Sequence, residues 1–277
     1  MTLNVFSHKL LEGKIAFITG GGSGICKGIT ESFMRHGANV AITSRNLQKL
    51  EKAATELEGK TGKSCLPIKA DVRDFESVKK AVESVIEKYG RLDILICGAA
   101  GNFLSPAAAL SSNAFKTVIE IDLIGTFHTC KAAFPFLKHS KGNIISISAT
   151  LHYTGTPLQA HAVAAKAGVD GLTKTLAVEW GQYGIRVNAI GKSYFFPFFD
   201  NNTILAPGPI EDTEGFRKLS PPKEILNGKK EITGVGPLNT FGKIQDIEYA
   251  ALYLASEAGR YVSGNILVVD GATWLGY

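Results

Sequence analysis

The sequence has little of what marks metalloproteins, secreted proteins and membrane proteins. Its four cysteines are scattered without a C-x-x-C pair, and no two histidines have the spacing of metal ligands. We therefore expect no metal site, and we expect the cysteines to be small buried side chains in a reducing compartment. No apolar stretch is long enough to cross a membrane, and the first residues contain no apolar secretion signal, so we expect a soluble intracellular protein without stable membrane insertion.

The charge of the chain excludes one class of partner. The formal net charge is +5, but no dense run of lysine and arginine is interleaved with aromatic residues. This argues against nucleic acid and is compatible with a small anionic ligand. With 277 residues, 45% of them hydrophobic, the chain is long enough for a sizeable core. We expect residues 1–277 to form a single domain.

Short apolar runs alternate with segments of helical periodicity. The expected strands are Ile15–Thr19, Val40–Thr43, Ser64–Lys69, Ile94–Cys97, Asn143–Ile147, Ile185–Ile190 and Ile266–Val269. The expected helices are Ile25–Arg35, Leu47–Leu57, Ser77–Lys88, Ala114–Leu137, Ala160–Trp180 and Ile247–Leu254. Apolar strands that alternate with helices predict a parallel sheet covered on both faces. The expected fold is α/β, a doubly wound, Rossmann-like parallel sheet in a three-layer α/β/α sandwich.

A glycine-rich loop follows the first expected strand. Glycines at such a junction let the backbone turn sharply and approach a pyrophosphate, which then lies at the N-terminus of the next helix. A tight turn alone would look the same, but its place in a repeating β/α chain favours a dinucleotide site. The candidate residues are Thr19, Gly20, Gly22, Ser23, Gly24 and Ile25.

The ends of the second and third strands indicate which dinucleotide. Sites for NAD usually have an acid after the second strand, whereas this chain has Ser44 and Arg45, which suit the 2′-phosphate of NADPH. Alternatively, Arg45 is only a solvated charge. Asp71, followed by Val72, is a candidate for the adenine amine, and Asp71 is equally suited to cap a helix.

These residues, together with Cys97-Gly98-Ala99-Ala100-Gly101, resemble the short-chain dehydrogenase/reductase family over essentially the whole chain. Cys26 replaces the last glycine of that family's T-G-x-x-x-G-x-G pattern. The family's catalytic residues are Asn, Ser, Tyr and Lys. The resemblance places Lys166 at the lysine, but Ala162, Ala149 and Asp122 stand at the tyrosine, serine and asparagine positions.

The 2,4-dienoyl-CoA reductase branch of that family has this pattern. The resemblance, carried also by Asn113–Val118 and Ala206–Ile210, implies reduction of an acyl-CoA substrate, a 2,4-dienoyl thioester, to a 3-enoyl thioester with NADPH as cofactor. Lys166 would bind the nicotinamide ribose, and Asp122 would hold the water that protonates the substrate. A structural role in a helix kink is the alternative for Asp122. Asn102 and Phe103 would line the acyl pocket.

The segment 191–237 is rich in Pro, Gly and Asn and is expected to be a lid. Here the resemblance places Pro207, Gly208 and Ile210 against the nicotinamide and Thr213 near the pyrophosphate. Removing Gly191–Leu205 joins Ile190 to Ala206 and restores the uninterrupted sequence that the family usually has at this point. This stretch has codons compatible with an unspliced intron translated in frame, which is our hypothesis. The alternative is a genuine aromatic insertion.

The resemblance also implies a homotetramer and a peroxisomal location. The chain ends in Trp274-Leu275-Gly276-Tyr277, which is not a tripeptide resembling S-K-L, and a cytoplasmic location is the alternative. Two other functions stay open: a reductase of other enoyl-CoA thioesters, and a non-catalytic NADP-binding scaffold.

Overall fold

A computed structural model describes residues 6–193 and 237–275. Its centre is a seven-stranded parallel sheet with the order β3-β2-β1-β4-β5-β6-β7. The strands are β1 Ile15–Thr19, β2 Asn39–Ser44, β3 Cys65–Lys69, β4 Ile94–Cys97, β5 Asn143–Ala149, β6 Arg186–Lys192 and β7 Ile266–Val268. The doubly wound fold expected from the sequence is therefore confirmed, and each expected strand agrees with an observed one to within two residues at either end.

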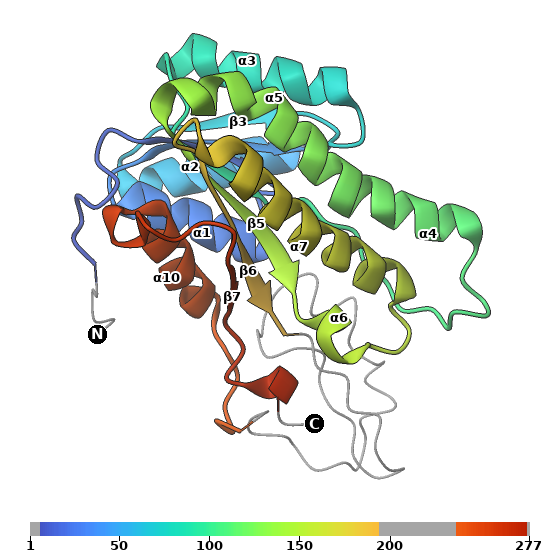
Figure 1. The fold of residues 1–277 in the computed structure, drawn as a ribbon. Helices are drawn as coiled ribbons and strands as arrows, with labels where there is room; N and C mark the ends of the chain where they lie inside the picture. The colour runs from blue at the N-terminus through green and yellow to red at the C-terminus, as the bar shows by residue number, and fades with distance from the viewer. Residues whose placement is uncertain (1–5, 194–236, 276–277) are drawn as a thin grey trace.

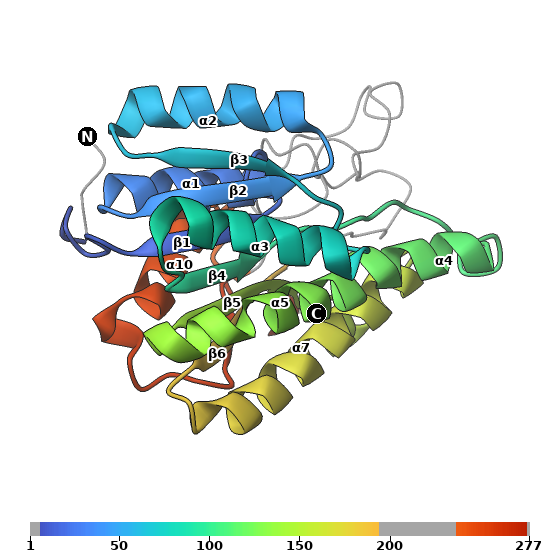
Figure 2. The same ribbon diagram turned by 90° about the horizontal axis from the view of Figure 1, so that it is seen from above.

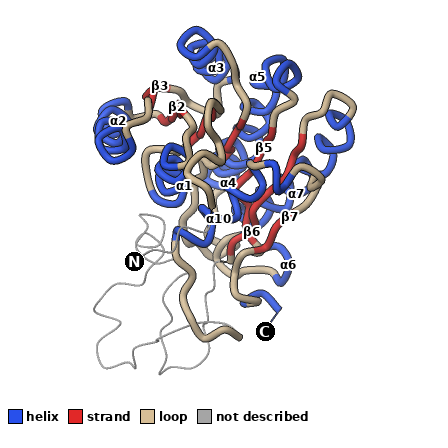
Figure 3. Tube along the Cα trace, turned by 90° about the vertical axis from the view of Figure 1, so that its left-hand side faces the viewer, coloured by secondary structure: helices blue, strands red, loops and turns tan. Residues whose placement is uncertain are grey.

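Helices cover both faces of the sheet (Figure 1). One face carries α1 Gly24–Arg35, α2 Leu47–Thr61 and α10 Ile244–Ala255. The opposite face carries α3 Phe75–Tyr89, α5 Gly125–Ser140 and α7 Ala160–Gly181, and α4 Ser112–Ile119 extends alongside α7. Figures 2 and 3 show the three layers from above and from the side. Three short helical elements also follow: α6 Leu151–Thr154, and the 3-10 turns Glu257–Gly259 and Thr273–Leu275.

The sheet separates two hydrophobic cores. Side chains alternate across each strand, so Ile18 and Ile42 face the core under α1 and α2, whereas Phe17 and Ala41 face the core under α3 and α5. Burial on both faces explains why the strands read as continuous apolar runs. All four cysteines are free and buried, as expected.

Polar residues set the helix boundaries. The Asn46 side chain accepts a hydrogen bond from the Lys49 amide at the start of α2, and Asp74 does the same for the Glu76 amide at the start of α3. Gly62 and Gly90 end these two helices in the left-handed conformation that glycine adopts without strain. The proposal that Asp71 caps a helix is therefore wrong, because Asp74 caps α3.

The helix expected over Ala114–Leu137 is interrupted. Between α4 and α5 lies a π-helical turn, Glu120–Ile124, with Asp122 at its centre. Such a turn accommodates one extra residue and changes the direction in which side chains point, and it occurs frequently at functional sites. The kink considered for Asp122 therefore exists, and it brings the carboxylate to the interior.

Strand β6 is longer than expected. It continues to Lys192, and its register pairs Gly191 with Ser148 and Lys192 with Ala149. The expected lid, 191–237, therefore does not begin at Gly191, because the first two residues belong to the sheet. The rest of the lid up to residue 236 lies outside the described residues from Tyr194 onward.

None of the described helices is both long and apolar enough to span a bilayer. Within the same ranges, 6–193 and 237–275, no group of three or more His, Cys, Asp or Glu side chains is arranged to hold a metal ion.

Helix α10 carries a titratable residue that should make stability depend on pH. Burial, and secondarily the nearby Glu31, raises the pKa of Glu248 from its ordinary 4.5 to about 7. The folded state therefore binds a proton more tightly than the unfolded state. The stabilisation is complete below pH 4.5 and is lost as the pH rises through 7. When the pH is raised from 5 to 8, we expect the free energy of unfolding of Glu248→Gln to increase by about 1 kcal/mol relative to that of the parent, after allowance for partial exposure.

Thermal denaturation at the two pH values measures this difference. The matched control is Glu257→Gln, since Glu257 is 90% exposed and its substitution should leave the pH dependence unchanged. Equal melting temperatures for Glu248→Gln and the parent at both pH values would contradict the raised pKa.

Candidate active site

A cavity of about 390 Å³ opens at the carboxyl ends of the strands, where an open α/β sheet binds its ligands. It brings together residues of β2, β5, β6, α1, α7 and the π-helical turn with residues of the loops that follow β1, β3 and β4. The expected site residues that line it are Gly20, Ser23, Gly24, Ile25, Ser44, Arg45, Asp71, Val72, Asn102, Asp122 and Lys166.

The glycine-rich loop fits a dinucleotide. Gly20 has φ +72°, a conformation that favours glycine, and a Cβ atom on Gly21 would lie 2.5 Å from the Ile42 side chain. Helix α1 begins at Gly24 with no side-chain cap at Ser23 and no acid in its first turn. Its first amides and the positive end of its dipole are therefore available to a pyrophosphate.

Two expected loop residues do not line the cavity. Thr19 is buried, and its Oγ1 accepts hydrogen bonds from the amides of Gly98 (2.9 Å) and Ala99 (3.1 Å). These bonds connect the end of β1 to the loop after β4 and so hold the cavity residues of that loop in position. A Cβ on Gly22 would lie 3.0 Å from Leu50 of α2, so Gly22 serves the packing of the loop against that helix.

Beside the cavity, a shallow depression lies at the end of β2. It is lined by Ser44, Arg45, Asn46, Leu47, Gln48 and Lys69. Lys69 is the parallel partner of Ser44 in the sheet, and the pairing brings a second cationic residue into the lining that Ser44 and Arg45 share. The sequence indicated Arg45 but not Lys69, which only the strand pairing brings here.

Asp71 is engaged by a neighbour. Its carboxylate accepts hydrogen bonds from the Arg73 guanidinium, with Nε at 3.0 Å from both oxygens. This contact, above all, holds the pKa of Asp71 below its usual value, and the more distant Arg45 adds to the effect. A carboxylate in this state is a hydrogen-bond acceptor, the role that an adenine amine requires.

The centre of the cavity holds one carboxylate and one ammonium group in contact. Lys166 Nζ lies 3.1 Å from Asp122 Oδ2 and donates to the Ile147 carbonyl at 2.9 Å. The other oxygen, Asp122 Oδ1, accepts from the Gly101 amide at 2.7 Å. Asp122 is 1% exposed and Lys166 11%. Each group is fixed from two sides, so the pair has one defined geometry.

A comparison with family models decides the classification. The model described as short chain dehydrogenase matches residues 14–199. The chain belongs to the short-chain dehydrogenase family. The resemblance identified in the sequence is thereby confirmed.

Relatives with assigned names cover almost the whole chain. A peroxisomal 2,4-dienoyl-CoA reductase that produces (3E)-enoyl-CoA, from Danio rerio, is 47% identical over 98% of this chain and 85% of its own length. The Arabidopsis thaliana protein of the same name is 44% identical over 98% and 87%. Among solved structures, a short chain dehydrogenase from Bacillus anthracis aligns with a TM-score of 0.78 and 39% identity, over 95% of this chain and 98% of that one.

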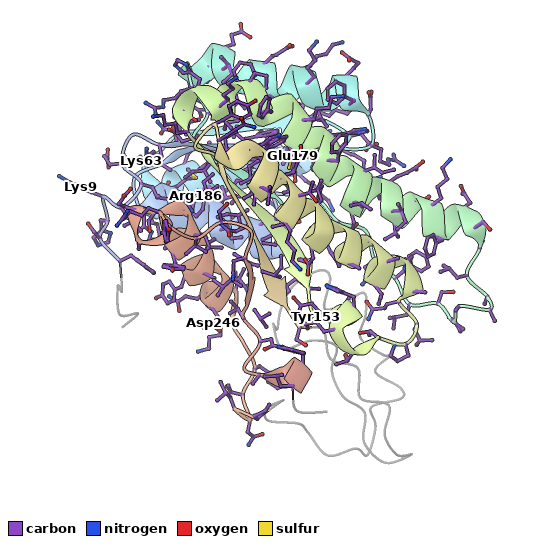
Figure 4. The ribbon with its side chains drawn as sticks, viewed as in Figure 1. Lys9, Lys63, Tyr153, Glu179, Arg186 and Asp246 are labelled. Carbon is purple, nitrogen blue, oxygen red and sulfur yellow. The ribbon has the colours of Figure 1, made fainter. Side chains whose placement is uncertain are left out.

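The family's tyrosine and serine positions are apolar here. Ala149 and Ala162 line the cavity and are 0% and 2% exposed. The nearby phenol, Tyr153, lies at the carboxyl end of the sheet (Figure 4). It does not line the cavity: its hydroxyl lies 3.4 Å from Asp170 Oδ2, and burial, followed by that carboxylate, raises its pKa to about 12. Tyr153 is therefore a poor substitute for the missing acid.

Asp170 braces the loop after β5. It accepts hydrogen bonds from Ser148 Oγ at 2.5 Å and lies 3.0 Å from His152 Nε2. It stands one helical turn beyond Lys166 on α7 and joins β5, α6 and α7. No local pattern in the sequence indicates this network, because its members come from three elements.

The expected acyl-side residues lie on the loop after β4. Asn102 lines the cavity, and its Nδ2 donates to Gln159 Oε1 at the start of α7 at 2.5 Å. Phe103 does not line the cavity: it is 37% exposed, and its ring centroid is 4.3 Å from that of His161. Burial lowers the pKa of His161, whose ring packs against that of Phe103.

Four expected cofactor residues, Pro207, Gly208, Ile210 and Thr213, lie outside the described residues. The cavity lining also includes residues that were not among the expected site residues, namely Cys26, Thr43, Ala70, Gly98–Ala100, Ile121, Ile147, Leu151 and Lys192. Lys192 was missed because the sequence placed it in a lid.

Proposed function

We propose that this chain reduces 2,4-dienoyl-CoA thioesters to 3-enoyl-CoA thioesters with NADPH, as part of the β-oxidation of unsaturated fatty acids. The observation that carries the proposal is the Asp122–Lys166 pair in a cavity with alanine at both positions where the family has its hydroxyls. The names of the relatives support the same substrate class and the (3E)-enoyl product.

The absence of a phenol is consistent with this chemistry. When bound, the nicotinamide supplies a hydride to the far end of the conjugated diene. The negative charge then spreads onto the thioester oxygen, and the proton goes to carbon. An alcohol-forming reaction needs an acid on the carbonyl oxygen, whereas this reaction needs an oriented water beside a carbon.

Each group of the pair would then have one task. Lys166 would bind the ribose of the nicotinamide and place a positive charge near the developing oxyanion. Asp122, held by Lys166 and by the Gly101 amide, would orient the water that protonates the dienolate. Asn102 would line the acyl side of the cavity. Phe103, whose ring packs on His161, would contact the acyl group beside it.

The preference for NADPH over NADH rests on the depression beside the cavity. Arg45 and Lys69 line it, together with Ser44. Two cations and a hydroxyl suit a 2′-phosphate, and no acid lines the depression to bind a free 2′-hydroxyl. Asp71 would accept a hydrogen bond from the adenine amine.

Turnover with defined substrates tests the reaction. We expect NADPH absorbance to fall on addition of a 2,4-dienoyl-CoA, with a kcat/KM about a hundredfold above that for a 2-enoyl-CoA. Turnover of the 2-enoyl-CoA alone would favour a reductase of other enoyl thioesters. NADPH binding without any turnover would favour a non-catalytic scaffold.

We also propose a homotetramer formed through α4, α5 and α7, and a peroxisomal location. Ile124, directly before α5, and Phe127, in the first turn of α5, are 39% and 41% exposed, and Val178 on α7 is 83% exposed. Apolar side chains of this size on two neighbouring helices suit an interface between subunits. The location is supported by the names of the relatives.

A further inference from the structure

The loop after β4 is held against the start of α7 by two hydrogen bonds. Asn102 Nδ2 donates to Gln159 Oε1 at 2.5 Å, and the Ser105 amide donates to the Leu158 carbonyl at 2.9 Å. The Gln159 side chain is 0% exposed and is outside the lining of the cavity. Any effect of Gln159 on the reaction must therefore pass through the residues that it holds.

The hydrogen bonds around Asn102 fix the orientation of both side-chain amides. The backbone amide of Phe103 can only donate, and it donates to Asn102 Oδ1 at 2.9 Å. Asn102 therefore presents Nδ2 to Gln159, and Gln159 must present Oε1 in return. This orientation leaves Gln159 Nε2 buried and without a hydrogen-bond partner in residues 6–193 and 237–275. The contact with Asn102 is thus kept although it leaves a buried donor unsatisfied, which is unfavourable for stability.

Two further features of the same turn are unfavourable for a helix start. Leu158 has a φ of 64°, in the left-handed region that residues other than glycine rarely adopt. Gln159 occupies the N-cap position of α7, yet its side chain caps none of the helix's own amides. The strained Leu158 carries the carbonyl that accepts from Ser105, and the side chain that does not cap accepts from Asn102. The start of α7 is therefore arranged to hold the loop after β4 and not to stabilise its own helix.

The same loop fixes the carboxylate of the Asp122–Lys166 pair. Gly101 directly precedes Asn102, and its amide donates to Asp122 Oδ1 at 2.7 Å. The loop and the π-helical turn pass close to each other here, because a Cβ atom on Gly101 would lie 3.1 Å from the Ile121 side chain. A shift of Asn102 would therefore also move the amide that fixes Asp122.

We propose that Gln159 is a positioning residue for the reduction: it holds Asn102 and, through the adjoining Gly101 amide, sets the orientation of the Asp122 carboxylate. The inference rests on the proposed function, in which Asp122 orients the water that protonates the dienolate. A misplacement of about 1 Å caused by a residue away from the reacting atoms is enough to lower a rate by up to about a hundredfold. The effect belongs in kcat, since Gln159 is outside the lining of the cavity.

Steady-state kinetics of two variants tests the proposal. Gln159→Met keeps the length of the side chain and removes the acceptor, so we expect kcat for dienoyl-CoA reduction to fall about tenfold. The KM for the acyl-CoA and the dissociation constant for NADPH should change by less than about threefold. Gln159→Glu keeps an acceptor oxygen for Asn102 and should retain a kcat within about threefold of the parent.

The matched control is Gln182→Met at the other end of α7. Gln182 is exposed, and its side chain donates to the Glu179 carbonyl at 3.0 Å. The same substitution there should leave kcat within about twofold of the parent. Melting temperatures show whether each variant is folded. An equal loss of kcat in folded Gln159→Met and Gln159→Glu would overturn the inference, because the acceptor would then not matter.

A double variant separates the positioning of Asp122 from a general structural role. In an Asp122→Asn background the charge that orients the water is already absent. Adding Gln159→Met should therefore lower kcat by less than about twofold further, although it lowers the kcat of the parent about tenfold. A further tenfold loss in the double variant would show that Gln159 does not act through Asp122, and would overturn the inference.

Amide hydrogen exchange gives a readout that needs no turnover. The Gly101 amide should be protected in the parent, and Gln159→Met should raise the exchange rate over residues 101–105 about tenfold without changing that of β4. Rapid exchange of the Gly101 amide in the folded parent would overturn the inference, whether or not a variant folds. Normal dienoyl-CoA reduction with an unchanged kcat in Gln159→Met would overturn this inference alone. Faster loop exchange in Gln159→Met, with no dienoyl-CoA reduction by the parent, would overturn the proposed reaction alone.

Discussion

Replacing Asp122 by asparagine is expected to lower kcat for dienoyl-CoA reduction by about a hundredfold to a thousandfold, while the dissociation constant for NADPH changes by less than about threefold. The amide keeps an oxygen for the Gly101 amide, which lies 2.7 Å from Asp122 Oδ1, so the loop after β4 stays in place. What is lost is the negative charge 3.1 Å from Lys166 Nζ, and with it the group that we propose to orient the water. Steady-state turnover and NADPH fluorescence measure the two quantities.

The π-helical turn offers a matched control. Glu120 lies two residues before Asp122 in the same turn and pairs with Lys116 at the surface, at 3.6 Å. Glu120→Gln removes the same charge from the same turn and should leave kcat within about twofold of the parent. If Asp122→Asn retained full turnover, the proton route through Asp122 would have to be abandoned.

Replacing Arg45 by alanine is expected to raise the dissociation constant for NADPH by about thirtyfold to a hundredfold and to leave that for NADH nearly unchanged. The reason is that Arg45 lines the depression at the end of β2, where only NADPH would place a phosphate. Titration of each cofactor into the protein gives both constants. Lys69→Ala should have the same sign and a smaller effect, because a lysine makes one point contact where an arginine makes two.

Lys49→Ala is the control for the change in net charge. Lys49 is an exposed residue of α2, close in sequence to Arg45 but not in the lining of the depression. It should leave both constants unchanged. An equal loss of NADH and NADPH affinity in Arg45→Ala would show that Arg45 holds the adenosine itself and not its phosphate.

The strands and most helices were readable from the sequence because the local signals agree with the packing. Apolar runs such as Phe17–Ile18 are buried on both faces, and Asn46 and Asp74 cap the helices that follow them. The glycine-rich loop was readable because its chemistry depends on adjacent residues. The fold could therefore be predicted almost entirely from local patterns.

The π-helical turn does have a signal in the sequence, a spacing of four residues, which the expectation of regular helical periodicity overlooked. Val118, Asp122, Thr126 and Cys130 are all buried, at successive spacings of four residues. A regular α-helix has 3.6 residues per turn, so such a stripe drifts by about 40° at each step. A turn with one extra residue removes part of this drift and keeps the stripe facing inward.

Other parts of the site have no local signal. Lys69 reaches the depression through strand pairing, and Asp170 collects contacts from three elements. Lys192 follows a glycine, and nothing in the sequence indicated that the strand continues through Gly191. These positions depend on contacts between distant segments, which periodicity and capping do not encode.

Helix α7 has a consequence for how the two ends of the ligand are coupled. Gln159, Ala162, Lys166 and Asp170 follow one another at spacings of three or four residues, so they form one stripe about 16 Å long. In this stripe Gln159 contacts the loop after β4, and Ala162 occupies the family's tyrosine position. Lys166 carries the ammonium group, and Asp170 contacts α6. If Lys166 binds the nicotinamide ribose as proposed, we expect a bulky fatty acyl group that displaces the first turn of α7 to shift this contact as well. We therefore expect the tolerance for acyl chain length and the affinity for the cofactor to be linked.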